Sequence, residues 1–512
     1  MFAKLFSSST YGIQAYIVEV EIHCERKLPS VTIVGLPDSA IKESRERVTA
    51  AIINSGFEFP LRKITINLAP ADIKKEGSAF DLPIAVGILA ANGLVDISKL
   101  DNALLLGELS LDGSLRKVKG VLPIVFEAKK KGFTKIILPI ESANEASLVD
   151  GMEILPFHSF KDLTSFLNGE ETLPLDIPHP EEKETVLNNY AIDFSDVKGQ
   201  ENVKRALEIA AAGGHNIIMI GPPGSGKTML AKRIPTILPP LTFIEAIETS
   251  IIHSVSGILS NDAPLVNQRP FRNPHHTVSD IALIGGGTVP KPGEVSYAHN
   301  GVLFLDELPE FKKNALEVLR QPIEDGTVTI SRAKMTLKFP ANFMLVAAMN
   351  PCPCGYFTDP NKECSCNTGQ IQKYLSKISG PLLDRIDIHI EVPAVRFKEL
   401  TSNAKTESSE VIRERVVSAR KVQLERFKNT PGIFSNSDMG TKEVKKFCVL
   451  DNSSLELLKM AMTKFSLSAR AFDRILKLSR TIADLDNEDN IKIQHISEAI
   501  QYRSLDREYW GK

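Results

Sequence analysis

The segment that most constrains how this chain can fold is the glycine-rich stretch GPPGSGKT at residues 221–228. It follows an apolar run at residues 216–220 that predicts a buried strand, and a helix is expected to begin at Gly226. In this setting a glycine-rich turn lets backbone N–H groups surround a phosphate, and the helix N-terminus adds a favourable dipole. The spacing is that of a P-loop, so the sequence predicts an α/β fold that binds a nucleoside triphosphate.

Two side chains of the P-loop have distinct expected roles. Lys227 supplies a point charge for the β- and γ-phosphates of ATP, and Thr228 offers a hydroxyl to Mg²⁺. The residues expected to bind the nucleotide are Gly221, Pro222, Pro223, Gly224, Ser225, Gly226, Lys227, Thr228 and Asp306. A tight strand–helix turn with an accidental lysine is the alternative, and the agreement between motif and context disfavours it.

Two carboxylates follow another apolar run, about 80 residues after the P-loop. Residues 302–305 predict a core strand, and Asp306 and Glu307 come directly after it. Asp306 is expected to hold Mg²⁺, and Glu307 is expected to orient and deprotonate the attacking water. A third run, 343–347, leads to Asn350, which would touch the γ-phosphate or its water. A turn-forming asparagine before Pro351 is an equal alternative.

The rest of the chain divides by composition. Its 512 residues are enough for three domains or slightly more. Residues 1–167 are mixed α/β, residues 168–190 form an acidic, proline-containing linker, residues 191–395 alternate helix and strand, and residues 396–512 are mostly helical. The sequence therefore predicts an α/β protein in which a parallel-sheet module is followed by a helical lid.

Charge and hydropathy exclude several classes of protein. The 61 basic and 63 acidic residues leave a net charge of −2, so any DNA contact has to come from a local patch. Six cysteines in a chain of this length exclude a disulfide-stapled scaffold. The N-terminus has no apolar signal region, and the longest apolar run, at 82–91, is too short to span a membrane. We therefore expect a reduced, cytoplasmic protein without membrane contact.

Four of the six cysteines fall within 15 residues of one another. They are Cys352, Cys354, Cys364 and Cys366. Thiolates in pairs that can converge suggest a tetrahedral structural Zn²⁺ site, and four reduced thiols in a surface loop are the alternative. The isolated Cys24 and Cys448 are expected to be inert core residues.

A short basic tip lies between two alternating segments at residues 327–339. Apolar and polar residues alternate on both sides of Arg332 and Lys334, which predicts a β-hairpin. An ordinary solvated turn is the alternative for the tip itself.

Several segments together resemble the YifB/ComM family of magnesium-chelatase-like AAA+ ATPases, which is related to the minichromosome maintenance helicases. The matching stretches beyond the P-loop are NLAPADIKKEGSAFDLPIA from residue 67, RPFRNPHHT from 269, GVLFLDEL from 301, NPCPCG from 350 and SGPLLDRID from 379. The resemblance covers nearly the full length. It implies an ATP-driven homo-hexameric ring and, for the ComM members, branch-migration helicase action on DNA in recombination of incoming DNA during natural transformation. A magnesium-chelatase-type motor that drives metal insertion or remodels proteins is the alternative.

The resemblance also assigns individual roles. It makes Asn350 sensor 1, and it makes Arg385 an arginine finger that reaches the neighbouring subunit's ATP. A surface pair of Arg385 with Asp384 or Asp387 is the alternative. It places Arg470 at sensor 2, with Arg474 one turn later on the same helix face as the alternative.

Two further segments take their expected roles from the family. Helicases of this group have a hairpin that points into the ring channel, and residues 327–339 lie at the corresponding position of this sequence. Arg332 and Lys334 are therefore expected to contact DNA. Residues 269–298 match an insertion in the second helix of the core, and we expect a nucleotide- or DNA-responsive loop there. His275 and His276 within it are weak metal-ligand candidates, because adjacent histidines rarely bind one ion without further partners.

Residues 1–167 resemble a Lon-protease-like fold of the ribosomal S5 type, as found in the chelatase subunit ChlI. Lon-type proteolysis needs a Ser–Lys dyad, and Ser78 lies near the nucleophile's place. Leu122 occupies the position of the lysine, and Lys117 and Lys119 are out of register. We therefore expect this domain to be non-proteolytic, with an active Lon-type protease as the less favoured alternative.

Overall fold

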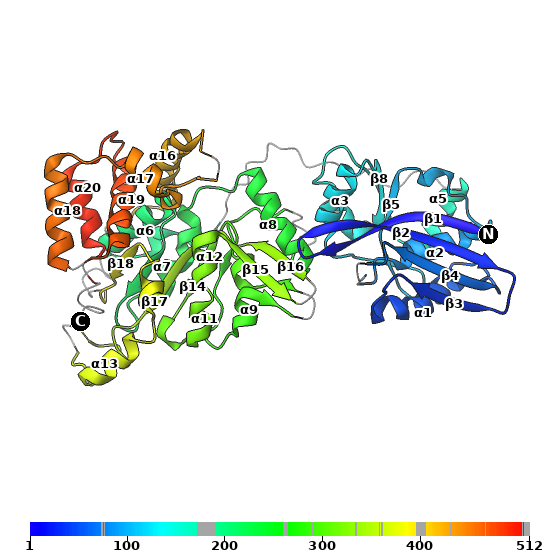
Figure 1. Cartoon of the computed structure of the whole chain (residues 1–512), viewed down its shortest axis with the longest axis horizontal. Helices are drawn as coiled ribbons and strands as arrows, with labels where there is room; N and C mark the ends of the chain where they lie inside the picture. Colours follow the sequence, from blue (N-terminus) through cyan, green and yellow to red (C-terminus); the bar gives the residue numbers. More distant parts are fainter. Residues whose placement is uncertain are drawn as a thin grey trace. The chain divides into compact units, whose positions relative to one another are not determined.

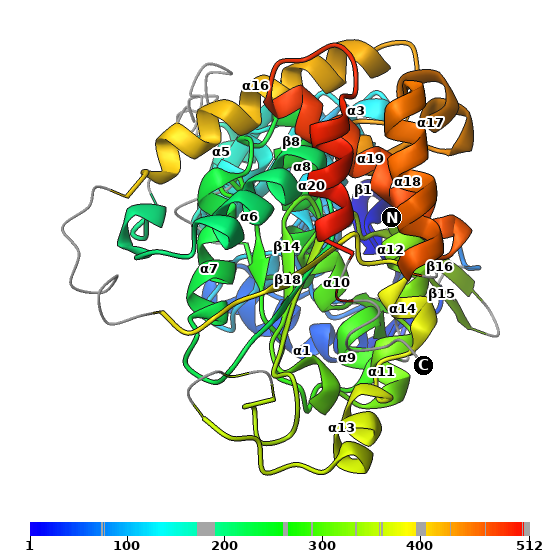
Figure 2. The same cartoon turned by 90° about the vertical axis from the view of Figure 1, so that its left-hand side faces the viewer.

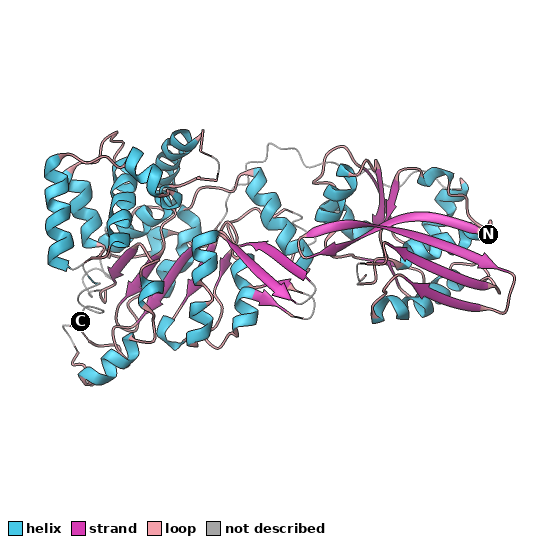
Figure 3. Cartoon of the chain, in the orientation of Figure 1, coloured by secondary structure: helices cyan, strands magenta, loops and turns pink. Residues whose placement is uncertain are grey.

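The computed structural model describes residues 1–72, 75, 77–170, 190–259, 265–287, 290–332, 335–357, 359, 362–395, 406–430, 432–465, 467–503 and 505. The fold is mixed α/β, as expected, with parallel sheets and a helical C-terminal region (Figures 1 and 3). The chain forms two compact units, Met1–Thr185 with Phe243–Asn267, and Val186–Thr242 with Gln268–Lys512. Most of the expected linker, residues 171–189 of 168–190, lies outside the described residues.

The first unit is built on a four-stranded sheet of order β1-β2-β4-β3. Its strands are β1 (Phe2–Tyr11), β2 (Gln14–Glu25), β3 (Ser30–Val34) and β4 (Lys63–Ala69). Every second residue of β2 from Val18 to Cys24 is buried, which is the period of a strand that covers a core with one face. Helices α1 (Ser39–Asn54) and α2 (Asp81–Ala91) pack in that core. Nearly all of α2 is apolar and buried, as a helix surrounded by other elements requires.

A smaller parallel sheet of order β5-β8-β9 completes the first unit. The remaining elements are β5 (Ala103–Leu105), β6 (Glu108–Leu109), β7 (Leu115–Arg116), α3 (Val121–Lys130), β8 (Lys135–Pro139), α4 (Ala143–Ala146), β9 (Glu153–Phe157), α5 (Phe160–Asn168) and the 3₁₀ turns Ser98–Leu100 and Ile140–Ser142. The expected Lon-like character of this unit stays a prediction.

One helix of the first unit comes from the middle of the chain. Helix α8 (Phe243–Ser256) packs against α3, and Ile247 joins the same buried cluster as residues of α3. The hydroxyl of Ser254 donates to the buried Glu145, and the amide of Gly120 donates to the Ser254 carbonyl over 3.2 Å. The interval 191–395, assigned from the sequence to the nucleotide-binding module, therefore contains a segment that packs in the N-terminal unit.

The second unit contains a five-stranded parallel sheet of order β11-β14-β17-β10-β18. Its strands are β11 (Phe271–Arg272), β14 (Val302–Leu305), β17 (Met344–Met349), β10 (Ile217–Ile220) and β18 (Ile388–Glu391). Strands β10, β14 and β17 are buried along their whole length, because helices cover both faces of the sheet. Figure 2 shows α6 (Glu201–Gly213) and α7 (Lys227–Ile237) to one side of it and α9 (Asp280–Ile284), α11 (Lys313–Glu317) and α12 (Arg320–Asp325) to the other.

Short elements connect these layers. They are α10 (Glu294–Tyr297), α13 (Thr368–Leu375), α14 (Gly380–Leu383), the ribbon of β12 (Gly285–Gly286) and β13 (Lys291–Pro292), and the 3₁₀ turns Phe194–Asp196 and Leu308–Glu310. The expected hairpin is present as β15 (Thr327–Arg332) and β16 (Met335–Pro340), paired antiparallel. Val328, Ile330, Leu337 and Phe339 are buried, so the alternation in the sequence corresponds to one packed face and one exposed face.

The C-terminal part of the second unit is helical. It comprises α16 (Ser409–Phe427), the 3₁₀ turn Asn436–Asp438, α17 (Thr441–Phe447), α18 (Asn452–Phe465), α19 (Ala469–Leu485) and α20 (Ile493–Gln501). Helix α16 packs against α6 and α7, and α19 packs against α6. The expected helical region after residue 396 is therefore continuous with the core of the sheet. Within the described chain, each helix is too short or too polar to span a bilayer.

Candidate nucleotide-binding site and cysteine cluster

The P-loop connects β10 to α7 at the carboxyl edge of the parallel sheet. Strand β10 lies between β17 and β18 and is parallel to both, so the P-loop lies beside the carboxyl ends of these strands, which is the edge where parallel sheets bind ligands. Gly224 and Gly226 have φ values of +78° and +89°, which favour glycine. At Gly221, a Cβ atom would lie 2.2 Å from the carbonyl oxygen of Val392. The backbone conformation at residues 224 and 226 and the close packing at residue 221 therefore require glycine at these positions.

Lys227 is buried inside this turn. Its ammonium donates to the carbonyl oxygens of Gly221 and Pro222 over 2.7 and 2.9 Å, and to Oδ1 of Asn350 over 3.3 Å. Burial lowers the pKa of Lys227 to about 8, although the nearby Asp306 opposes this shift. The structure thus brings the P-loop lysine and Asn350, at the end of β17, to the same point.

Thr228 and Asp306 form the second pair of the site. The Thr228 hydroxyl donates to Oδ2 of Asp306 over 2.6 Å, and Oδ1 of Asp306 accepts the backbone amide of Glu307 over 3.0 Å. A hydroxyl and a carboxylate beside a phosphate-binding turn are the oxygen donors that Mg²⁺ prefers. These residues therefore fit a magnesium–nucleotide substrate.

Glu307 extends from a strained turn directly after β14. Its φ of +53° is in the left-handed region, which is uncommon for a residue other than glycine. Its carboxylate lies 3.4 Å from Nδ1 of His276, whose ring is tilted by 34° against that of His275 at 4.1 Å between ring centroids. Among the described residues, the four clustered cysteines are the one set of three or more potential ligands close enough to share a metal ion, so the two histidines are not part of such a set.

Two residues of this site are not predicted by the sequence. His276 is a weak metal-ligand candidate there, whereas in the structure it contacts Glu307. Gln200 is not among the expected site residues, but its side-chain amide donates to the carbonyl oxygens of Ser225 and Pro393 over 2.9 and 2.8 Å. Gln200 thereby ties the P-loop to the segment after β18. The RNPHH stretch was a signal for His276, whereas Gln200 belongs to no motif.

Arg385 is buried after α14. It donates to the carbonyl oxygen of Pro381 over 2.6 Å and forms an ion pair with Glu324 of α12. Its pairing partner is therefore neither Asp384 nor Asp387.

The two neighbouring carboxylates contact helix α19 instead. Asp387 forms an ion pair with Arg474, and its Oδ2 lies within hydrogen-bond distance, 3.1 Å, of Nδ1 of His215. Arg470 is well exposed, with Nη1 3.9 Å from Oδ2 of Asp384.

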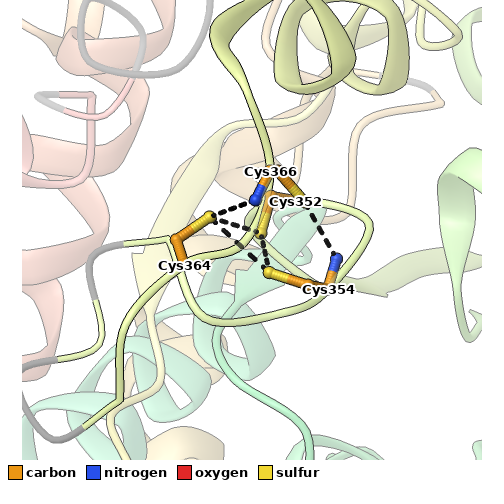
Figure 4. Close-up of side chains that lie close together, drawn as sticks. All are labelled: Cys352, Cys354, Cys364 and Cys366. Atoms are coloured by element: carbon orange, nitrogen blue, oxygen red, sulfur yellow. Dashed lines mark hydrogen bonds between the residues drawn. The ribbon is translucent and has the colours of Figure 1, made fainter.

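The four clustered cysteines converge after β17, as Figure 4 shows. The Sγ atoms of Cys352, Cys354 and Cys364 are separated by 3.3–3.7 Å, and with Cys366 all four lie within 4.8 Å of one another. Four sulfurs bound to one Zn²⁺ at about 2.3 Å would be roughly 3.8 Å apart. Backbone donors, that of Tyr356 foremost, lower the pKa of the Cys354 thiol to about 5, whereas the pKa of the Cys364 thiol is raised, despite the backbone donor of Cys366, by burial and by its hydrogen bonds with Cys354 and Cys352. The cluster therefore fits a tetrahedral metal. Cys24 and Cys448 are both buried elsewhere.

The predicted DNA and protease residues lie elsewhere in the fold. Arg332 ends β15 opposite Met335, so it stands at the tip of the hairpin, and Lys334 lies outside the described residues. In the N-terminal unit, Ser78 donates its hydroxyl to Glu108. Leu122 is buried in α3.

Family models match three stretches of the chain. "Magnesium chelatase, subunit ChlI" matches residues 193–400, "Subunit ChlI of Mg-chelatase" matches residues 20–142, and "Magnesium chelatase, subunit ChlI C-terminal" matches residues 406–503.

Curated relatives match over almost the full length. Competence protein ComM of Haemophilus influenzae is 46% identical, covering 99% of this chain and 98% of the relative. The YifB protein of Escherichia coli is 44% identical, covering 97% of this chain and 96% of the relative. The magnesium-chelatase 67 kDa subunit of Heliobacterium mobile is 28% identical, covering 30% and 27% of the two chains. With a P-loop module and a helical C-terminal region that agree with these matches, the chain belongs to the YifB/ComM family of magnesium-chelatase-like AAA+ proteins.

Proposed function

We propose that this protein is a magnesium- and ATP-dependent AAA+ motor that assembles into a homo-hexameric ring and drives branch migration of DNA. The observation that carries the ATPase part is the Thr228–Asp306 pair at 2.6 Å beside the buried ammonium of Lys227. A point charge for the phosphates and a hydroxyl and a carboxylate for Mg²⁺, brought to one site, are parts that phosphoryl transfer uses.

The residues of the site have separate roles in the proposed hydrolysis. Lys227 neutralises charge on the β- and γ-phosphates, and Thr228 and Asp306 hold Mg²⁺ through oxygen atoms. Glu307 accepts the proton of the attacking water, and Asn350 orients that water or the γ-phosphate. His276, which contacts Glu307 in the structure, supports the position of that carboxylate.

Arg385 is proposed to act on the nucleotide of a neighbouring subunit. A planar, permanently charged guanidinium suits the charge that develops during phosphoryl transfer, and it would exchange its ion pair with Glu324 for the neighbour's phosphate. Arg470 is proposed as the sensor of nucleotide on the lid, because its guanidinium is largely exposed.

Complementation between inactive subunits tests the shared site. Arg385→Ala and Lys227→Ala subunits are each expected to be inactive, and mixing them should restore ATPase because some sites then combine an intact P-loop with an intact arginine. Hydrolysis should also rise steeply with protein concentration below the assembly threshold. Inactivity in every mixture, or full hydrolysis by the monomer, would show that Arg385 does not act in trans.

DNA is proposed as the substrate on which the motor acts. This proposal rests on the name of the relative, a competence protein, and on the basic tip of the β15–β16 hairpin. Six copies of Arg332 and Lys334 would line a ring channel with positive charge although the net charge of one chain is −2. The test is ATP-dependent conversion of a labelled four-way junction to its migrated products, with Lys227→Ala as the inactive control. Failure with ATP, Mg²⁺ and assembled protein would reject the DNA proposal.

The alternative functions have weaker support. Chelatase family models match residues 20–142, 193–400 and 406–503, but the curated chelatase subunit is 28% identical over 30% of this chain, whereas ComM is 46% identical over 99% of it. A Lon-type protease would need a lysine as base, and the hydroxyl of Ser78 instead donates to a carboxylate, that of Glu108. We therefore propose a non-proteolytic N-terminal unit.

A structural Zn²⁺ is proposed at the cysteine cluster. Its support is the convergence of four sulfur atoms within 4.8 Å. Protein purified without chelators should contain about one zinc per chain, and Cys352→Ser should lose it. Metal-free wild-type protein by elemental analysis would reject this site.

A further inference from the structure

The loop that carries the cysteines is in direct contact with the P-loop. Gly355, directly after Cys354, has a φ of +87° and faces Pro223. A Cβ atom at Gly355 would lie 2.5 Å from Cδ and 2.7 Å from Cγ of Pro223, closer than a side chain can approach. The turn after Cys354 therefore packs against the P-loop at Pro223.

The cysteines determine where Gly355 lies. Its amide donates to Sγ of Cys352 over 3.2 Å, and the amide of Phe357 donates to the same sulfur over 3.4 Å. Cys352 is fully buried, and the amide of Cys354 donates to Sγ of Cys366 over 3.4 Å. The two ends of the loop are thus joined through sulfur atoms, and the position of Gly355 depends on that junction.

The same loop is connected to the phosphate site at its start. Asn350, two residues before Cys352, accepts a hydrogen bond from Lys227 over 3.3 Å. Movement of the cysteine loop would therefore change the P-loop at two places, through Pro223 and through Asn350 with Lys227.

We propose that a metal ion in the cysteine cluster controls nucleotide affinity by holding the cysteine loop against the P-loop. This inference rests on the proposed nucleotide and zinc sites. Metal binding holds the two cysteine pairs together and fixes Gly355, which keeps Pro223 in the conformation that surrounds a phosphate. Loss of the metal frees the cysteine pairs and weakens nucleotide binding through Pro223 and through Asn350 with Lys227, while the hydrogen bond between Thr228 and Asp306 is kept.

The direct test measures binding of a fluorescent ATP analogue to the full-length protein in three states: zinc-loaded, stripped by a chelator that is then removed by dialysis, and reloaded. Stripping should weaken binding about tenfold or more, and reloading should restore it. Equal affinity in the three states, with zinc content verified, would overturn the inference. Absence of zinc in all preparations would reject the metal site, and absence of nucleotide binding in the loaded state would reject the proposed function.

A pair of glycine substitutions tests the contact without removing metal. Gly355→Ala places a Cβ against Pro223, whereas Gly432→Ala meets the same backbone strain, at a φ of +84°, with nothing within 4 Å. Gly355→Ala should retain zinc and weaken nucleotide binding about tenfold or more, and Gly432→Ala should bind as wild type does. Equal nucleotide affinity of the two variants would show that the contact of Gly355 with Pro223 does not connect the cysteine cluster to the nucleotide site. Loss of zinc from Gly355→Ala together with wild-type affinity would overturn it as well.

Discussion

Lys227 is buried, and the oxygen atoms that accept hydrogen bonds from its ammonium belong to uncharged groups. Its ammonium is satisfied by carbonyl oxygens of the P-loop and by Asn350, and burial lowers its pKa to about 8. A phosphate group placed beside it would favour the charged form and raise the pKa again. Nucleotide binding and protonation of Lys227 are therefore linked.

The linkage predicts how nucleotide affinity depends on pH. Below about pH 8 Lys227 is charged with and without nucleotide, so affinity is at its maximum. Above this pH the free protein loses the proton and has to regain it when nucleotide binds. Nucleotide affinity should therefore fall with rising pH, with a slope that approaches about tenfold per pH unit. Lys227→Arg, which stays charged, should show a flat profile over the same range. A wild-type profile that stays flat between about pH 7 and pH 9.5 would contradict the assignment of Lys227 to the phosphate.

Glu307→Gln should separate binding from hydrolysis. The amide cannot accept a proton from water, whereas Thr228 and Asp306 still hold Mg²⁺, so the variant should bind ATP and lose about 10²–10⁴ in turnover. Steady-state ATPase and binding of a fluorescent analogue measure the two effects. ATPase close to the wild-type rate would contradict the role of Glu307 as the base.

The residues that could be predicted from the sequence are those whose partners lie in a motif of fixed spacing. Lys227, Thr228 and Asp306 are brought together because strands β10 and β14 end at the same edge of one sheet. The contacts of Gln200 with Pro393 and of Arg385 with Glu324 join segments far apart in the chain. No local pattern encodes such pairs, so the structure was needed to find them.

At the scale of elements, a buried polar network joins the sheet to the lid. His215, two residues before β10, contacts Asp387 before β18 over 3.1 Å and the hydroxyl of Thr481 in α19 over 2.8 Å. Burial, together with the nearby positive charges, lowers the pKa of His215 to about 3. The lid is thereby joined to the starts of β10 and β18, two neighbouring strands of the parallel sheet.

This network predicts a defined loss of stability in mild acid. The folded protein keeps His215 neutral down to about pH 3, whereas the unfolded chain takes up a proton below about pH 6.5. The contribution of His215 to the free energy of unfolding is therefore fully present above pH 6.5. It should fall by about 1.4 kcal/mol between pH 7.5 and pH 5.5. Urea unfolding at the two pH values measures it, with His215→Gln as the control that lacks the histidine. The same pH dependence in both proteins would contradict the assignment.

The hairpin gives a prediction for DNA binding. Replacing Arg332 and Lys334 by alanine should weaken DNA binding and reduce its salt dependence by about one counterion for each phosphate that is no longer neutralised. Lys338→Ala is the matched control, because Lys338 is exposed on the same hairpin but pairs with Thr329, away from the tip. Titrations of labelled DNA at several salt concentrations measure both effects. Equal weakening by the control would show that the tip has no special role.

The elements themselves were largely predictable, whereas their packing was not. Short apolar runs predicted β10, β14 and β17 because a strand covered on both faces has no polar alternation. The same reasoning could not place α8. An apolar helix face indicates that a helix covers a core but not which core, and α8 packs with α3 of the N-terminal unit.

At the scale of the whole molecule, the chain combines two compact units and crosses between them more than once. Residues 243–267 leave the nucleotide-binding unit after α7 and return before β11. The N-terminal unit is thus completed by a segment that lies in the sequence between the P-loop at 221–228 and the carboxylates Asp306 and Glu307. We expect removal of residues 1–167 to expose the apolar side of α8, so experiments on function should use the full chain.

The most direct test of the proposed DNA motor is ATP hydrolysis by the full-length protein measured against increasing concentrations of four-way junction DNA. Single-stranded DNA and a DNA-free reaction serve as references, and Glu307→Gln reports the background. We expect magnesium-dependent hydrolysis that junction DNA stimulates several-fold, with stimulation lost when Arg332 and Lys334 are replaced. Hydrolysis at one rate with and without DNA, or no hydrolysis by assembled protein with Mg²⁺, would contradict it.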